Sequence, residues 1–382
     1  MINGYRIRQG RELARLTQTE LAEAVGTVQA MIAQFESGRA LPSDTHMEAI
    51  ASRLGFPVSF FSREDPPNFP LGSLLFRSHV NIAAGDRDEV YRLGQIEFEL
   101  LTTLAKRVRN KIALRLPQLS DEPVDIVTAA QLTRNAFGLS LDVPIPHLVR
   151  VVEQSGTFVL TLPARFATCD AFSLWVNVAS SQVTFEMKKP LVVLSGETPG
   201  DRLRSSLAHE LGHLILHQAI RGTSREIEDE ANRFAAELLL PEAAMRDEIT
   251  TPVTLTSLSK LKPLWGVSIQ MLIRRARDLQ IITERQYSYL FKQVSDHGWK
   301  ANEPIALQVE KPRALRQMAE IVFGKGTPNI NYSRLAHDVD MPPLFVKRLM
   351  GTYATREEYS INTVKKHNEV ESLSEVGSKE SR

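Results

Sequence analysis

The spacing of hydrophobic and polar positions divides the chain into many helical segments and one short stretch of strands. Between residues 1 and 62 apolar residues recur at the three- and four-residue spacing of short amphipathic helices. The stretch "REDPPNFPLG" (63–72) follows, and its prolines exclude a continuous helix. From 88 to 116 the apolar spacing becomes helical again without a break, which predicts one long helix.

Three segments in the middle of the chain have the character of short strands. They are rich in β-branched and aromatic residues and read "TFVLTLP" (157–163), "AFSLWV" (171–176) and "PLVVLS" (190–195). Helical spacing returns after them and continues, in short segments, through 254–294. The polar end "VKKHNEVESLSEVGSKESR" has too little apolar surface to form a core, so we predict disorder there.

These patterns predict a multidomain, mainly α protein with one small sheet. An all-α domain comes first, an α+β domain follows, and a helical region completes the chain. The expected boundaries are 1–62 for the first domain, 63–118 for a linker and long helix, 119–245 for the α+β domain, 246–362 for the helical C-terminal region and 363–382 for the tail.

Composition and charge narrow the possible environment and partners. The hydrophobic fraction is 43% and the formal net charge is +1, which describes an ordinary globular protein without a general attraction to nucleic acid. The single Cys169 excludes an internal disulfide and a multi-cysteine metal site. No apolar run is long enough to span a membrane and no signal peptide is present, so we expect a cytoplasmic protein without a membrane partner.

A histidine pair in "SSLAHELGHLILH" (205–217) is the main candidate for chemistry. On a helix, His209 and His213 lie one turn apart, so both rings can reach one ion. Glu210 lies beside them, where it can act as a general base toward water. This HExxH arrangement is typical of zinc-dependent hydrolases. The alternative is an ordinary helix with satisfied polar residues, although the expected Thr198 N-cap and Pro199 start support a well-formed helix.

A catalytic zinc needs a third protein ligand. The extended pattern HExxHxxGxxH is absent, because Leu216 and Ala219 occupy its glycine and histidine positions. His217 lies roughly 12 Å along the helix axis from His209, too far for one ion to take all three histidines. We therefore assign His217 a supporting or structural role.

The helix in "EIEDEANRFAAELLLP" (226–241) is the better source of that ligand. Glu228 and Asn232 are four residues apart and share a face, so Glu228 is the favoured ligand and Asn232 can orient a ligand by a hydrogen bond. Glu230 is the alternative ligand from the same helix.

The two linked motifs "RLRSSLAHELGHLILH" (202–217) and "EDEANRFAAELLLP" (228–241) resemble the ImmA/IrrE zinc metallopeptidases over roughly residues 120–245. The resemblance implies a zincin-like fold in which His209, His213 and Glu228 bind Zn²⁺ and Glu210 is the catalytic base. It also implies a protein substrate, namely a transcriptional repressor cut by limited proteolysis.

The stretch "LTQTELAEAVGTVQAMIAQFESGRALPS" (16–43) predicts two short helices joined at Gly26, from about 18 to 24 and from about 28 to 36. This is the spacing of a helix-turn-helix, whose second helix enters the DNA major groove. Over residues 5–62 the chain resembles the lambda-repressor/Cro-like (XRE) type. The DNA contacts expected from that resemblance and from position are Gln18, Thr27, Gln29, Ala30, Gln34 and Arg39.

Gln29 is the first choice for a base contact, because glutamine can hydrogen-bond adenine through two atoms. The charge of this domain opposes strong binding, since its arginines are matched one for one by acids. We therefore expect modest affinity for double-stranded operator DNA unless two copies of the chain pair. A protein-interaction module of the same fold is the alternative.

A second helix pair is expected in "LTSLSKLKPLWGVSIQMLIRRARDLQIITERQYSYLF" (255–291), with a turn near Gly266 and arginines after it. It is either a second helix-turn-helix or a helix pair that packs on the α+β domain, and we expect Pro263 to interrupt its first helix.

Two functions follow from these observations. The leading hypothesis is a transcriptional regulator with zinc-dependent endopeptidase activity toward a repressor. The alternative is a DNA-binding transcription factor whose peptidase-like domain senses a ligand or holds zinc structurally, without proteolysis.

Overall fold

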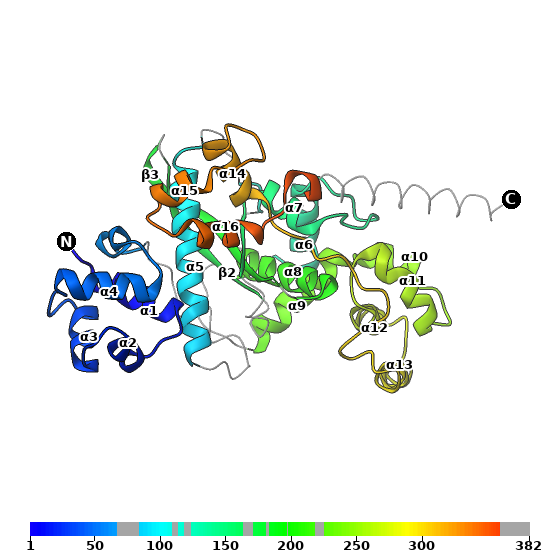
Figure 1. Cartoon of the computed structure of the whole chain (residues 1–382). Coiled ribbons are helices and arrows are strands. Elements are labelled where there is room, and N and C mark those ends of the chain that lie inside the picture. Colours follow the sequence, from blue (N-terminus) through cyan, green and yellow to red (C-terminus); the bar gives the residue numbers. More distant parts are fainter. Residues whose placement is uncertain are drawn as a thin grey trace.

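The computed structural model describes residues 1–66, 84–108, 114–117, 124–162, 171–180, 183–196, 198–217 and 225–359. In these segments the chain is mainly helical and contains a three-stranded sheet, as predicted (Figure 1). Most of the proline-containing linker and the predicted tail, 363–382, lie outside the described residues. None of the described helices combines the length and the apolar character needed to cross a membrane.

The N-terminal domain is a compact set of short helices, coloured blue in Figure 1. They are α1 (Gly4–Leu13), α2 (Gln18–Ala24), α3 (Gln29–Glu36), α4 (Asp44–Leu54) and the 3-10 helix η1 (Val58–Ser62). Leu21 of α2 and Ile32 and Phe35 of α3 are buried in its separate core. The predicted helix-turn-helix is therefore confirmed, and Val28 is the N-cap of its second helix.

The sheet consists of β1 (Phe158–Leu162), β2 (Ala171–Ser180) and β3 (Val183–Ser195) in the order β1-β3-β2. The central strand β3 pairs parallel with β1 and antiparallel with β2. All three predicted strands are present, and β2 and β3 extend beyond their predicted ends. Since β2 pairs only with β3 within the described residues, its other side is an edge of the sheet.

Helices cover both faces of this sheet, so its central strand is buried on both sides. One face of β3, with Val192 and Leu194, belongs to a core shared with α6 (Ile126–Ala136), α7 (Leu148–Gln154), α8 (Gly200–Leu216) and α9 (Arg225–Leu239). The other face, with Leu191 and Val193, packs against α5 (Ala84–Ala105), α14 (Ala314–Phe323), α15 (Tyr332–Asp338) and α16 (Pro343–Gly351). Helix α5 and the helices α14, α15 and α16 thus share one core with the strands.

Helix α5 ends at Ala105, whereas the apolar spacing predicted a helix to 116. The chain turns at Lys106 and Arg107, and Arg107 forms an ion pair with Asp338 at 2.6 Å. The helix therefore stops before Lys106 although the apolar spacing continues, and residues 109–113 lie outside the described part of the chain.

Two buried glutamates of α5 contact different parts of the chain. Glu97 contacts Tyr353, and Glu99 contacts the N-terminal domain. Glu97 accepts a hydrogen bond from the Tyr353 hydroxyl at 3.0 Å, and burial raises its pKa to about 8. Glu99 points toward the N-terminal domain, where Arg6 lies 2.8 Å away and Arg63 lies 2.7 Å away. Because these pairs are buried or half-buried, the helix-turn-helix domain is fixed to α5 by charge as well as by packing.

The C-terminal region also contains α10 (Glu242–Glu248), α11 (Leu255–Trp265), α12 (Ile269–Asp278) and α13 (Glu284–Asp296). Trp265 and Ile269 from α11 and α12 belong to the same core as α8 and α9. The prediction that Pro263 interrupts the first of these helices is wrong, since α11 continues past it to Trp265. Pro263 lies near the end of α11, where little helix remains to be distorted.

Candidate metal centre

Helix α8 carries the HExxH sequence. Its residues Leu203, Leu207, Leu211 and Leu214 form an apolar stripe and are buried in the core. The helix begins at Gly200 with Pro199 as its N-cap, one residue later than the predicted Thr198 cap. The Thr198 hydroxyl is buried and accepts no backbone proton of the helix, so the start is set by proline geometry rather than by a side-chain cap.

Helices α8 and α9 pack closely enough to share one site. A Cβ atom added to Gly212 would lie 3.2 Å from the Cα of Ala231 and 3.2 Å from Cδ1 of Phe234. The small residues at this crossing therefore allow the backbones to approach. This packing carries the acidic side of α9 over the two histidines of α8.

The side chains of His209, His213 and Glu228 converge at this crossing, and one ligand atom of each lies within 4.8 Å of the others. The two Nε2 atoms are 2.9 Å apart, and the Glu228 carboxylate approaches them at 3.2 Å and 3.5 Å. Two imidazoles and a carboxylate are a donor set that suits Zn²⁺.

Hydrogen bonds behind the two histidines aim their Nε2 atoms at this point. His209 Nδ1 lies 3.0 Å from Asn232 Oδ1, which can accept its proton. His217 Nε2 lies 2.8 Å from the Glu230 carboxylate, and its Nδ1 lies 3.2 Å from Nδ1 of His213.

These contacts define the tautomers of the neutral rings. A carboxylate only accepts, so His217 carries its proton on Nε2 and offers Nδ1 as the acceptor to His213. His209 and His213 then both hold their protons on Nδ1, which leaves a lone pair on each Nε2.

The alternative placement of Glu230 in the ligand set does not agree with this geometry, because its carboxylate contacts His217 instead. Sequence reasoning did not identify that contact. The two residues are thirteen positions apart and belong to the end of α8 and to α9, so no spacing within one helix could have pointed to this contact.

Glu210 has a partner that sequence reasoning missed. Ser173 on β2 donates its hydroxyl proton to Glu210 Oε2 at 2.5 Å. Both side chains are buried, and the nearby Trp175 donates to the Leu214 carbonyl at 3.3 Å. The edge strand is thus attached to the same turns of α8 that carry the histidines. The only signal in the sequence is a serine among apolar residues in "AFSLWV".

The surface of the N-terminal domain presents the residues expected to contact DNA. Gln29, Ala30, Gln34 and Arg39 are exposed, while Gln18 and Thr27 are half-buried. Gln29 donates to Gln18 at 2.6 Å, and Gln18 donates to Glu36 at 2.8 Å. In the described part of the chain, no other element therefore covers the polar side of α3. The side chain of Gln29 is held in place by its hydrogen bond to Gln18.

The helix order, the small sheet and the two-helix site define a helix-turn-helix domain followed by a metallopeptidase-like domain. Comparison with family models agrees with this class. Residues 7–61 match the helix-turn-helix family, and residues 153–277 match a peptidase family described as the IrrE N-terminal-like domain. The chain therefore carries the fusion that its motifs predicted.

No curated protein sequence matches the chain significantly. Among solved structures, the chain is similar to Bacillus thuringiensis PlcR in complex with the peptide PapR7 and DNA. The sequence identity is 15%, the match covers 79% of this chain and 98% of that chain, and the TM-score is 0.15.

Proposed function

We propose that this protein is a transcriptional regulator with zinc-dependent endopeptidase activity, acting by limited proteolysis on a repressor-type protein. The observation that supports it best is the convergence of His209, His213 and Glu228 beside Glu210. Its pairing with a helix-turn-helix domain connects the activity to gene regulation.

The geometry fits a metal ion better than a closed hydrogen-bond network. Among the described residues, nothing donates a hydrogen bond to the buried Oε1 of Glu228, which is costly for a carboxylate oxygen without a further ligand. Two nitrogens that bind one tetrahedral zinc at about 2.0–2.1 Å lie roughly 3.3 Å apart, close to the 2.9 Å between the two Nε2 atoms. Bound zinc would act as a Lewis acid toward the scissile carbonyl.

In this proposal the chain itself supplies proton transfer and orientation. Glu210 accepts a proton from the attacking water and passes it to the leaving amine. Ser173 holds the Glu210 carboxylate by donating to one of its oxygens. Asn232 and the His217–Glu230 pair hold the two ligand histidines in one orientation.

In this proposal the substrate backbone binds along the edge of β2. An extended peptide can pair with an exposed strand edge through main-chain hydrogen bonds. Since Ser173 on this strand contacts Glu210, a peptide added along β2 runs beside the proposed base.

In the same proposal, α3 of the N-terminal domain binds double-stranded operator DNA, with Gln29 as the first base contact. The arginines of this domain are largely engaged within the protein, since Arg6 and Arg11 form ion pairs with Glu99 and Glu36. Phosphate neutralisation is therefore weak in one copy, and tight binding needs two copies on the DNA.

The decisive test measures zinc and cleavage on the same preparations. The purified protein should contain one zinc per chain, and repressors from the same genome should be cut in a chelator-sensitive manner. Glu210→Gln should keep the zinc and lose at least about 100-fold in cleavage rate. A Glu210→Gln protein that still cleaves at the normal rate would refute this mechanism.

The second candidate is a transcription factor whose peptidase-like domain senses a ligand or holds zinc structurally. The buried ion pairs between α1 and α5 support it, because they offer a direct route from that domain to the DNA-binding surface. His209→Ala distinguishes the two candidates. A structural zinc contributes to folding, so its loss should unfold the domain, whereas loss of a catalytic zinc abolishes only activity.

A further inference from the structure

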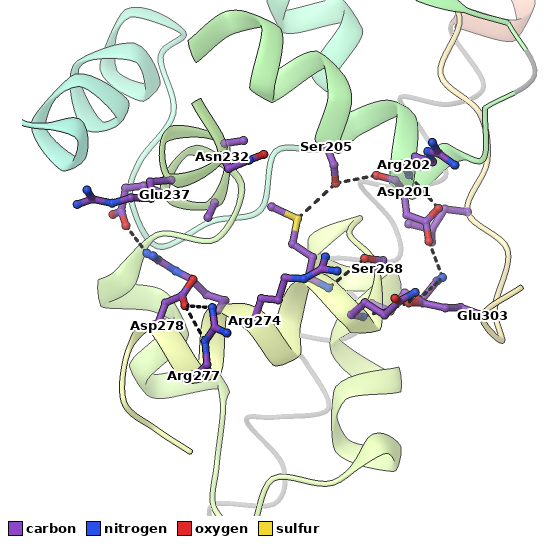
Figure 2. Close-up of a pocket in the computed structure, with 18 of the residues that line it drawn as sticks. Asp201, Arg202, Ser205, Asn232, Glu237, Ser268, Arg274, Arg277, Asp278 and Glu303 are labelled. Atoms are coloured by element: carbon purple, nitrogen blue, oxygen red, sulfur yellow. Dashed lines mark hydrogen bonds and ion pairs between the residues drawn. The ribbon is translucent and has the colours of Figure 1, made fainter. Parts of the chain in front are cut away.

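A large cavity lies beside the proposed metal centre and has no role in the function described so far. Its volume is about 1760 Å³, and its walls come from α8, α9, α12 and the segment 300–309 (Figure 2). Asn232 lines it and contacts His209 at 3.0 Å, so the cavity adjoins the ligand histidine from behind. Ser205, one turn before His209, lies on the same wall.

The acidic residues of the cavity wall are already paired. Asp201 and Glu303 both contact the buried Lys262, at 2.7 Å and 2.9 Å. The pairs of Glu237 with Arg275, Asp278 with Arg277 and Glu242 with Arg246 engage three more, and Figure 2 shows the pair of Asp278 and Arg277. Only Asp229, which lies 4.0 Å from Arg225, is loosely held.

Three cations on the same wall lack such partners. Among the described residues, Arg233 of α9, Arg274 of α12 and Lys300 have no acidic group within ion-pair distance, and all three are exposed. The guanidinium of Arg274 lies over the ring of Phe291 at 5.6 Å, which leaves its N–H groups available. The cavity therefore offers positive charge from three elements to whatever occupies it.

The size of the cavity favours a peptide. Pockets for small molecules usually measure about 300–1000 Å³, and this cavity is larger. A DNA duplex does not suit it, because a recognition helix must lie open to enter a major groove. Gln270 and Arg274 of α12 instead line the cavity together with residues of α8 and α9.

We propose that this cavity binds an acidic segment of the protein substrate, beside the bond that is cut. The proposal rests on the endopeptidase function above and adds a substrate class to it. Carboxylates of the substrate pair with Arg233, Arg274 and Lys300, so the enzyme selects its target by the charge of the segment beside the scissile bond.

The test measures binding rather than cleavage. The full-length Glu210→Gln protein is titrated against a fluorescein-labelled twelve-residue peptide in which Glu and Asp alternate with Ala and Leu. A second peptide carries Gln and Asn at the acidic positions. We expect the acidic peptide to bind more tightly, and we expect added salt to remove that difference. Equal affinity for the two peptides would overturn the proposal.

Charge removal in the cavity should weaken binding of the acidic peptide. Each of Arg233→Gln, Arg274→Gln and Lys300→Gln should cost about 2- to 5-fold in affinity, and the triple variant at least about 10-fold. Lys260→Gln and Arg285→Gln remove exposed cations outside the cavity and should change nothing. Equal losses in these controls, or binding of a twelve-nucleotide DNA in place of the peptide, would also overturn the proposal.

The two proposals fail in different ways. Binding of the acidic peptide without cleavage of any repressor contradicts the endopeptidase function and leaves the cavity assignment standing. Cleavage that is unaffected by the triple variant contradicts the cavity assignment alone.

Discussion

The chain contains two helix pairs with the same local construction and different surroundings. In both pairs a threonine caps the first helix, Thr17 before α2 and Thr254 before α11, and each cap is part of a reciprocal capping box. A glycine with positive φ ends the first helix region in both, Gly26 at 72° and Gly266 at 67°. The helix that follows is short and amphipathic in each case.

Their tertiary environments are opposite. The polar face of α3 is exposed, with Gln29 and Gln34 at the surface. By contrast, α12 contributes Ile269 and Leu272 to the large core and turns Arg274 toward the cavity, while its Arg275 is buried. The same local pattern therefore exposes its second helix in the N-terminal domain, whereas in the C-terminal region the second helix lines the cavity.

The largest expected difference between the pairs concerns stability. Arg275→Met leaves the buried Glu237 carboxylate without its ion-pair partner, so we expect the free energy of unfolding to fall by about 3 kcal/mol. Arg39→Met on the exposed pair should change it by less than about 0.5 kcal/mol. Urea denaturation of the two variants measures both free energies of unfolding. A similarly small decrease in both variants would mean that the ion pair of Arg275 with Glu237 does not stabilise α12.

The turn glycines give the next largest difference. A Cβ at Gly266 would lie 2.7 Å from Nε of Arg204, whose guanidinium is buried and donates to the Ile145 carbonyl at 2.7 Å. Apart from its chain neighbours, no atom of the described residues lies within 4 Å of a Cβ at Gly26. Gly26→Ala should therefore cost only the backbone strain of about 1 kcal/mol, and Gly266→Ala about 2–3 kcal/mol. Equal shifts of the denaturation midpoint would contradict this reasoning.

A base contact should distinguish the exposed pair in a DNA-binding assay. On duplexes selected by the protein from a random pool, Gln29→Ala should lower affinity by about 1–3 kcal/mol and relax the preference at one base pair. Gln270→Ala, the matched change on α12, should leave the preference intact. A variant at Gln29 with unchanged selectivity would move the base contact to another residue of α3.

The smallest expected effect concerns phosphate contact. Arg39→Gln should weaken binding to all duplexes similarly and reduce the slope of log affinity against log salt by about 1. Arg274→Gln should leave that slope unchanged, because its side chain faces the cavity. A change of slope in the Arg274 variant would show that α12 reaches DNA after all.

Local sequence patterns predicted the elements well and their ends less well. The three strands and the two helices of the N-terminal pair follow from residue type and spacing over a few positions. The end of α5 could not be predicted this way, because the apolar spacing continues where the chain turns at Lys106. Pro263 was misjudged for a similar reason, since its effect depends on how near the helix end it lies.

The two histidines of the candidate metal centre could be predicted from the sequence of one helix. His209 and His213 are one turn apart, so their convergence is a property of helix geometry alone. Glu228 required the assumption that the next helix folds back, and the spacing left Glu230 open as an alternative. Ser173 could not be found, because its contact with Glu210 joins a strand to a helix.

By itself, the sequence determined the helix pairs, the strands and the paired histidines, because each depends on neighbours within a few residues. The tertiary structure alone decided which acidic residue meets those histidines and which helix pair stays exposed. It also decided where cations without an acidic partner among the described residues gather around a cavity. These features depend on packing between segments far apart in the chain. Close packing buries one face of each element, and the face that remains open follows from the whole set of contacts rather than from any single segment.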